Sequence, residues 1–189
     1  TWVEFKINKK AKFSNQEKIT PQDIKFSLNI LKNYGRPHTR SYYSLVEKIE
    51  ITSKNSIKFY FKKESNFEMP LIIGLMPILS KKYWEYKSFD KTTLDPFISS
   101  GPYLIEKITP GRSITYKKNS NWWNKDSEDS LGRYNFEYIK YDFYRDSNVA
   151  LEAFLSGEYD IQIEDNAIRW KQAYTNDNII KKTFPKKSP

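Results

Sequence analysis

The stretch SSGPYLIEKITPGRSITYKKNSNWW, residues 99–123, carries the clearest structural pattern in the chain. Two short segments of alternating apolar and polar residues flank the dipeptide Pro110-Gly111. Proline presets its own φ and glycine accepts a positive φ, so Pro-Gly between two such segments is typical of a tight turn. We therefore expect a β-hairpin, entered at Gly101-Pro102, with one slip in the alternation of its first strand. The alternating apolar side chains are Tyr103, Ile105, Ile108, Ile114 and Tyr116.

The same period of two recurs on both sides of this hairpin and predicts further strands. A second hairpin is expected around Lys54-Asn55. The order strand, helix, strand near the C-terminal end favours a right-handed crossover connection. The predicted additional strands are residues 2–7, 46–51, 57–61, 137–144 and 159–163.

Helix signals lie between the strands. Thr20 can cap a helix that has Pro21 at its first position and Asp23 at its third, and Gly35 can end this helix. We also expect a short helix within residues 67–79 that is broken by prolines, and another that starts at Ser80. A fourth helix over 148–156, capped by Asp146 or Ser147, has Gly157 in position to end it. The residues expected on the buried face of this fourth helix are Val149, Ala150, Ala153 and Phe154.

The composition of the 189 residues argues against catalysis. The chain has no cysteine, which excludes disulfides, cysteine metal sites and a cysteine nucleophile, and its single histidine, His38, is expected on a surface loop. Neither a GxGxxG nor a P-loop motif occurs. The adjacent carboxylates Glu164 and Asp165 are typical of solvated loop charge rather than of an acid–base pair. We expect no enzyme activity, no cofactor and no metal.

The net charge of +9 raises the alternative of a nucleic-acid-binding module. However, most lysines are spread along the chain and alternate with acidic residues, while the aromatic residues follow the spacing of strand cores. Dense basic clusters occur only at residues 9–12 and 181–187. A lysine-rich, solvated surface explains this pattern better than a phosphate-binding face does.

The order of the motifs resembles the extracytoplasmic solute-binding proteins of peptide and nickel ABC importers, known as family 5. The resemblance rests on SGPY, PGRSI and WW in residues 99–123, on GRYNFEYIKYDFYRDSNVALEAFLSGEYDI at 132–161, and on ITPQDIKFS at 19–27. It runs from about Trp2 to Trp170 and is most similar to the branch that binds murein-derived or short peptides and a peptide-nucleotide antibiotic. The sequence departs from the family pattern at one point. In our alignment, Gln16-Glu17 stands where an early loop of the family usually has Asp-Gly.

The resemblance implies a mixed α/β (α+β) class and part of a bilobed periplasmic-binding-protein fold of type II with antiparallel or mixed sheets. It implies that the chain is an interior piece of a longer, extracytoplasmic or periplasmic protein. Residues 1–96 would belong to the smaller lobe-two domain, 97–163 to the central part of the main lobe, and 164–189 to the start of the second ligand-binding lobe or a tail. The implied partners are a short peptide ligand and an ABC permease with its ATPase, and we expect a monomer that does not bind nucleic acid.

The resemblance also places two segments at the ligand cleft. Aromatic side chains there would give contact area, an arginine would bind a carboxylate, and an acidic residue would bind an ammonium group. The first segment is expected to be a loop in which one of its two adjacent tyrosines packs inward and the other faces the ligand. The alternative ligands for the same fold are a nickel chelate, an oligosaccharide or a nucleopeptide. The candidate ligand-binding residues are Arg40, Tyr42, Tyr43, Glu164, Asn166 and Trp170.

Overall fold

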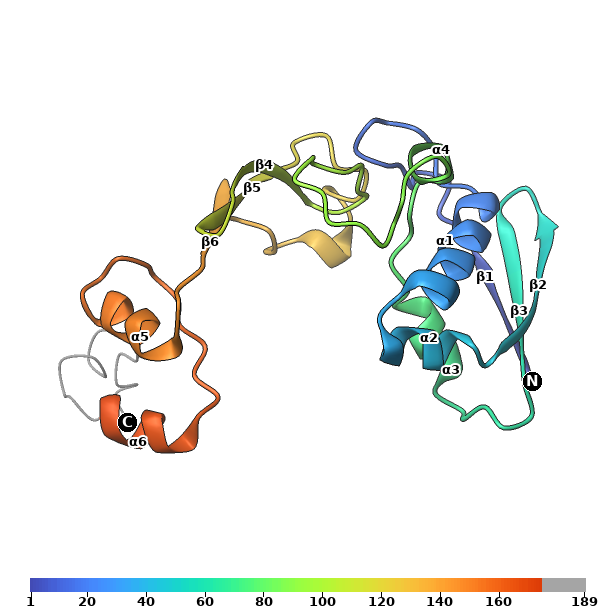
Figure 1. Cartoon of the computed structure of the whole chain (residues 1–189). Coiled ribbons are helices and arrows are strands. Elements are labelled where there is room, and N and C mark those ends of the chain that lie inside the picture. The colour runs from blue at the N-terminus through green and yellow to red at the C-terminus, as the bar shows by residue number, and fades with distance from the viewer. Residues whose placement is uncertain (175–189) are drawn as a thin grey trace, which may run out of the picture. The chain divides into compact units, whose positions relative to one another are not determined.

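A computed structural model describes residues 1–174, and the chain divides into two compact units, Thr1–Tyr141 and a second that begins at Asp142 (Figure 1). Helices and strands are mixed along the chain and the sheets are antiparallel, which confirms the predicted α/β class. The elements are β1 (Trp2–Lys6), α1 (Pro21–Tyr34), α2 (Pro37–Tyr43), β2 (Val46–Ser53), β3 (Ser56–Phe61), α3 (Met69–Gly74), α4 (Lys81–Trp84), β4 (Tyr103–Thr109), β5 (Ser113–Lys118), the 3₁₀ helix η1 (Glu128–Ser130), β6 (Tyr138–Asp142), α5 (Ser147–Leu155) and α6 (Ala167–Ala173).

The N-terminal sheet has the order β1-β3-β2, and both of its strand pairs are antiparallel. Phe59 of the central strand lies opposite Val3 on one side and Ile49 on the other. Because side chains alternate along a strand, Ile57, Phe59 and Phe61 all point to the same face, and all three are buried. This arrangement confirms the strands and the hairpin predicted from the alternation in residues 2–7, 46–51 and 57–61.

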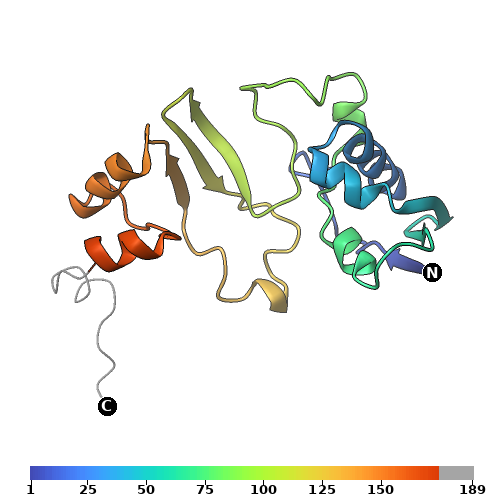
Figure 2. The ribbon, with the colours of Figure 1, turned by 60° about the horizontal axis from the view of Figure 1, so that its bottom comes forward.

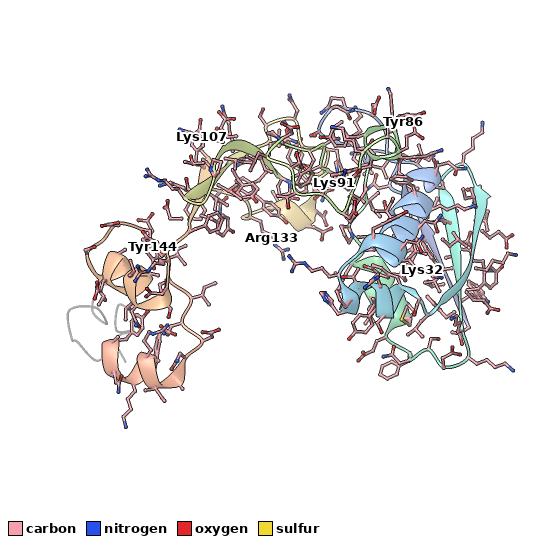
Figure 3. All side chains as sticks on the ribbon, viewed as in Figure 1. Lys32, Tyr86, Lys91, Lys107, Arg133 and Tyr144 are labelled. Carbon is pink, nitrogen blue, oxygen red and sulfur yellow. The ribbon has the colours of Figure 1, made fainter. Side chains whose placement is uncertain are left out.

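The helices α1, α2 and α3 cover one face of this sheet (Figures 1 and 2). Lys32, labelled in Figure 3, reinforces the packing because its Nζ donates to the carbonyl of Val46 at 3.0 Å. The predicted short helix after residue 67 is α3; Met69 and Ile73 are buried, whereas Leu71 is exposed. The buried cluster between helices and sheet consists of Leu28, Leu31, Tyr43, Val46, Ile57, Phe59, Phe61, Met69, Ile73 and Met76.

The start of α1 is held by the predicted cap. The backbone N–H of Asp23 donates to Thr20 Oγ1 at 3.3 Å, and the backbone N–H of Thr20 donates to Asp23 Oδ2 at 2.9 Å, which completes a capping box. The other carboxylate oxygen of Asp23 accepts from the backbone N–H of Lys81 at 2.9 Å. One buried carboxylate therefore joins the start of α1 to the start of α4.

The hairpin predicted from residues 99–123 is formed by β4 and β5, which pair from Tyr103↔Lys118 to Thr109↔Ser113 (Figure 2). The register shifts between Ile105 and Lys107, where the sequence alternation slips, and Gly111 in the turn has φ +68°. β6 lies beside β5 in the order β4-β5-β6. After the hairpin, the indole N–H groups of Trp122 and Trp123 donate to the same acceptor, the carbonyl of Ser100, at 2.9 and 3.2 Å.

In the second unit, Asp146 caps α5 by accepting from the backbone N–H groups of Asn148 and Val149. Gly157, with φ +83°, follows the helix as predicted, and its N–H and that of the next residue donate to carbonyls of the last turn. The predicted buried face of α5 is only partly correct, because Ala153 is buried whereas Val149 is exposed. Tyr144 packs on Tyr159 with ring centroids 5.6 Å apart (Figure 3).

One strand prediction fails in the described residues. Residues 159–163 form no strand, so the predicted strand–helix–strand crossover is absent. Gln16 in the early loop has a positive φ of +68°, a backbone conformation that a glycine would favour, and the replacement of the family's Asp-Gly by Gln16-Glu17 stays a prediction. The assignment of residues 1–96, 97–163 and 164–189 to lobes stays a prediction, and the two compact units divide at a different place, after Tyr141.

Candidate functional site

The first candidate segment is a helix and not the loop that the sequence led us to expect. α2 starts with Pro37, whose fixed φ and missing N–H suit the first position of a helix, and it runs to Tyr43. Gly35 therefore ends only α1, and a second helix begins after the turn. Arg40 is exposed on α2, and its carbonyl accepts the backbone N–H of Ser44 at 2.9 Å.

The two adjacent tyrosines of α2 occupy different environments. Tyr43 is 7% exposed and belongs to the buried cluster of the first unit, whereas Tyr42 is 48% exposed. Successive side chains on an α-helix point in directions about 100° apart, so neighbours can separate in this way. Burial raises the pKa of the Tyr43 phenol. The prediction that one of the two tyrosines packs inward is confirmed for Tyr43, although helical geometry and not an extended backbone separates the pair, and the prediction that the other faces a ligand stays a prediction.

The second candidate segment leads into α6. Asn166 caps this helix, since its Oδ1 accepts from the backbone N–H groups of Ile168 and Arg169 at 3.0 and 3.1 Å. The side chain of Glu164 is only 1% exposed, so the prediction of a solvated carboxylate at this position is wrong. Its Oε1 accepts from the backbone N–H of Asn166 at 2.9 Å, and its charge is paired with Arg169.

Trp170 lies on α6 and is 51% exposed. Its ring stacks on that of Tyr174, with centroids 5.0 Å apart and an angle of 26° between the ring planes. Tyr174 is buried and also packs against Phe154 of α5. Burial first, and then the negative charge of Glu164, raise the pKa of the Tyr174 phenol, while Arg169 acts in the opposite direction.

The structure thus gathers the six candidates into two groups. Arg40, Tyr42 and Tyr43 share α2 in the first unit, and Glu164, Asn166 and Trp170 share α6 and its entry in the second unit.

Sequence reasoning missed Arg169, Ser147 and Tyr174, which contact the second group. A cap signature at Asn166 could have revealed the helix, but no local pattern reports that Arg169 turns back to Glu164 or reaches Ser147, 22 residues earlier in the chain.

Within residues 1–174 no group of three or more His, Cys, Asp or Glu side chains is placed to hold a metal ion. His38 is exposed on α2, where its ring Nε2 lies 3.3 Å from Thr39 Oγ1. No helix within these described residues has the length and apolar character needed to cross a membrane.

Comparison with known families gives a match over the whole chain. The model for bacterial extracellular solute-binding proteins, family 5, middle, matches residues 1–189. The chain belongs to family 5 of the bacterial extracellular solute-binding proteins. This membership confirms the resemblance seen in the sequence motifs.

Several curated proteins are similar to this family 5 chain along its length. A Brucella melitensis protein, which its name describes as a binding protein, is 40% identical over 194 residues, covering 100% of the chain. Two Agrobacterium fabrum proteins follow, one named "Probable peptide-binding protein YejA" at 34% identity over 90% of the chain and one named peptidoglycan-binding protein YepA at 32% over 100%. The chain spans only 32%, 29% and 33% of the lengths of these relatives, respectively.

Solved structures of binding proteins share the fold of this family 5 chain. A periplasmic oligopeptide-binding protein of Thermotoga maritima, bound to mannohexaose, matches 92% of the chain with a TM-score of 0.68 and 24% identity. A binding protein of A. tumefaciens R10 in complex with agropinic acid matches 84% with a TM-score of 0.68 and 25% identity. The nickel–histidine complex of NikZ from Campylobacter jejuni matches 93% with a TM-score of 0.74 and 17% identity. The chain covers 32%, 31% and 34% of these three proteins.

Proposed function

We propose that the protein containing this chain is the substrate-binding component of an ABC importer. It captures short peptides or peptide-like solutes outside the cytoplasm, in the periplasm, and delivers them to a membrane permease that works with an ATPase. It acts as a monomer and carries out no chemistry on its ligand. The observation that carries this proposal is the family 5 match over the whole chain. The names of two relatives, for peptide and for peptidoglycan binding, favour a peptide-like ligand.

The chemistry of the exposed candidate side chains supports a ligand of this class. Arg40 presents a guanidinium group, which binds a carboxylate through two parallel hydrogen bonds. Tyr42 and Trp170 each leave about half of their surface open, and aromatic side chains give large contact area together with one polar atom. We assign a direct ligand contact to Arg40 and Tyr42 within the first unit and, separately, to Trp170 within the second unit.

The other three candidates would each support a ligand contact within their own unit. Tyr43 packs α2 against the core of the first unit, Asn166 caps α6, and Glu164 forms an ion pair with Arg169 inside the second unit. In this proposal they hold the elements that carry Arg40, Tyr42 and Trp170.

Titration calorimetry on the full-length protein tests the proposal. The titrants are a pool of synthetic tri- to pentapeptides, a nickel–histidine chelate and a mannose oligosaccharide. We expect peptide binding that Arg40→Ala and Tyr42→Ala each weaken by about 1–3 kcal/mol, the usual range for a contact residue. Tyr86, an exposed tyrosine outside α2 that is labelled in Figure 3, provides the matched control, and Tyr86→Ala should bind like the parent.

Two results would contradict this assignment. Binding of the chelate or the oligosaccharide without any binding of peptides would overturn the ligand class. Peptide binding that is unchanged in both α2 variants would remove α2 from the site while leaving the ligand class intact.

A further inference from the structure

The Glu164 carboxylate already has a hydrogen-bond partner and an ion-pair partner inside the protein. Its side chain is 1% exposed, its Oε1 accepts the backbone N–H of Asn166 at 2.9 Å, and both of its oxygens lie 3.4 Å from Arg169 Nη1. A buried charge is tolerated only when it is paired and hydrogen-bonded. Glu164 therefore depends on Arg169 for its charge balance.

Arg169 extends the connection beyond this pair. Its side chain is 22% exposed, and its second terminal nitrogen, Nη2, donates to Ser147 Oγ at 2.7 Å. Ser147 is the first residue of α5, whereas Glu164 lies in the segment before α6. One planar guanidinium thus connects α5 with α6 and the segment before it. We name Glu164, Arg169 and Ser147 the Glu164 network.

Trp170 directly follows Arg169 on the same helix. One contact of its ring is the stack on Tyr174, and Tyr174 in turn packs against Phe154 of α5, with ring centroids 6.3 Å apart. The orientation of Trp170 therefore depends on how α6 lies against α5, and the Glu164 network is a hydrogen-bonded connection between these two helices near Trp170.

We infer that Glu164, Arg169 and Ser147 are positioning residues that hold Trp170 in its stacked geometry and, through Trp170, set the affinity for the ligand. Glu164 acts through Arg169 and not as a direct partner for a ligand ammonium group. The second half of this inference rests on the proposed function, because it requires that Trp170 contacts the ligand. The first half concerns the protein without ligand.

The test uses the full-length protein labelled with 5-fluorotryptophan, in which the ¹⁹F signal of Trp170 is assigned by its loss in Trp170→Phe. Arg169→Met should shift this signal and weaken peptide binding about tenfold, within the range of coupling between residues of one network. Arg169→Lys, which keeps the charge without the planar fork, should restore part of both effects. The double variant Glu164→Gln/Arg169→Met should bind no more weakly than Arg169→Met, because the two residues act together. The matched control is Arg145→Met, since Arg145 is an exposed arginine of the same unit whose ion pair lies on the surface.

The outcomes distinguish two claims: that the network positions Trp170, and that Trp170 in turn sets the affinity for the ligand. An unchanged Trp170 signal in Arg169→Met would overturn the network, and so would an equal shift in Arg145→Met. A shifted signal with unchanged peptide affinity would overturn the link to the ligand. If the parent binds no peptide, the proposed function fails, and the ¹⁹F signal alone decides whether the network positions Trp170. If Arg169→Met does not fold, Ser147→Ala, which removes one hydrogen bond, must shift the Trp170 signal for the inference to stand.

Discussion

Replacing each of the two tyrosines of α2 with alanine should separate stability from binding. Tyr43 is 7% exposed and packs in the cluster that contains Leu28, Val46 and Phe61, so Tyr43→Ala leaves a cavity in the core of the first unit. Aromatic-to-alanine changes at such positions cost about 3–5 kcal/mol in the free energy of unfolding. Tyr42 is 48% exposed, and Tyr42→Ala should cost about 1 kcal/mol or less. The same variant removes a proposed ligand contact and should weaken peptide binding by about 1–3 kcal/mol.

Urea unfolding and calorimetry on the full-length variants measure the two effects. Because a long protein can unfold in several steps, hydrogen–deuterium exchange of peptides from α1 and α2 should report the stability of the first unit directly. Tyr43→Ala should raise exchange throughout these helices, while Tyr42→Ala should leave it close to that of the parent and lower affinity. If the two variants lose the same stability, or if Tyr43→Ala exchanges like the parent, the core assignment of Tyr43 is wrong.

Two further changes test the packing of the first unit. Burial raises the pKa of Tyr43 above its ordinary value of about 10, so its contribution to stability is complete below that pH and is lost as the pH rises through the higher folded-state pKa. The fall in urea midpoint between pH 8 and 11 should therefore be smaller in Tyr43→Phe than in the parent, and equal slopes would contradict this. A Cβ at Gly35 would lie 2.3 Å from the carbonyl oxygen of Leu31, so Gly35→Ala should cost about 1–3 kcal/mol through forced backbone shifts. Gly101→Ala, where a Cβ would meet no atom within 4 Å, should stay within about 0.5 kcal/mol of the parent in the same measurement, and equal losses would refute the clash.

Elements whose signals are local could be predicted from the sequence. The capping box at Thr20 and Asp23 places its donor and acceptor three residues apart, and the hairpin around Gly111 is defined by a turn between two alternating segments. In both cases the partners of each hydrogen bond lie close in the chain. The sequence therefore contains the whole interaction, including the slip between Ile105 and Lys107 that became a shift in register.

Predictions failed where the outcome depends on distant partners. Residues 159–163 alternate like a strand, but a strand is stable only when a neighbour supplies its hydrogen bonds, and both described sheets are built from other segments. The miss at α2 has a different, local cause: the segment looked like a loop because Gly35 ends the preceding helix, and the signal of Pro37 for a new helix was overlooked.

For single side chains of the candidate site, too, the sequence could not reveal contacts with distant residues. The sequence could suggest Glu164 as a ligand-binding carboxylate, because that hypothesis needs only the residue type and a resemblance to a family. Whether the carboxylate is available to a ligand depends on Arg169 and Ser147, and the contact with Ser147 exists only once α5 and α6 have packed. A buried ion pair costs desolvation energy, and this cost is offset only when the geometry satisfies both partners. For that reason the same glutamate can bind a ligand in one packing arrangement and position a neighbouring tryptophan in another, and the contacts around it favour the second role here.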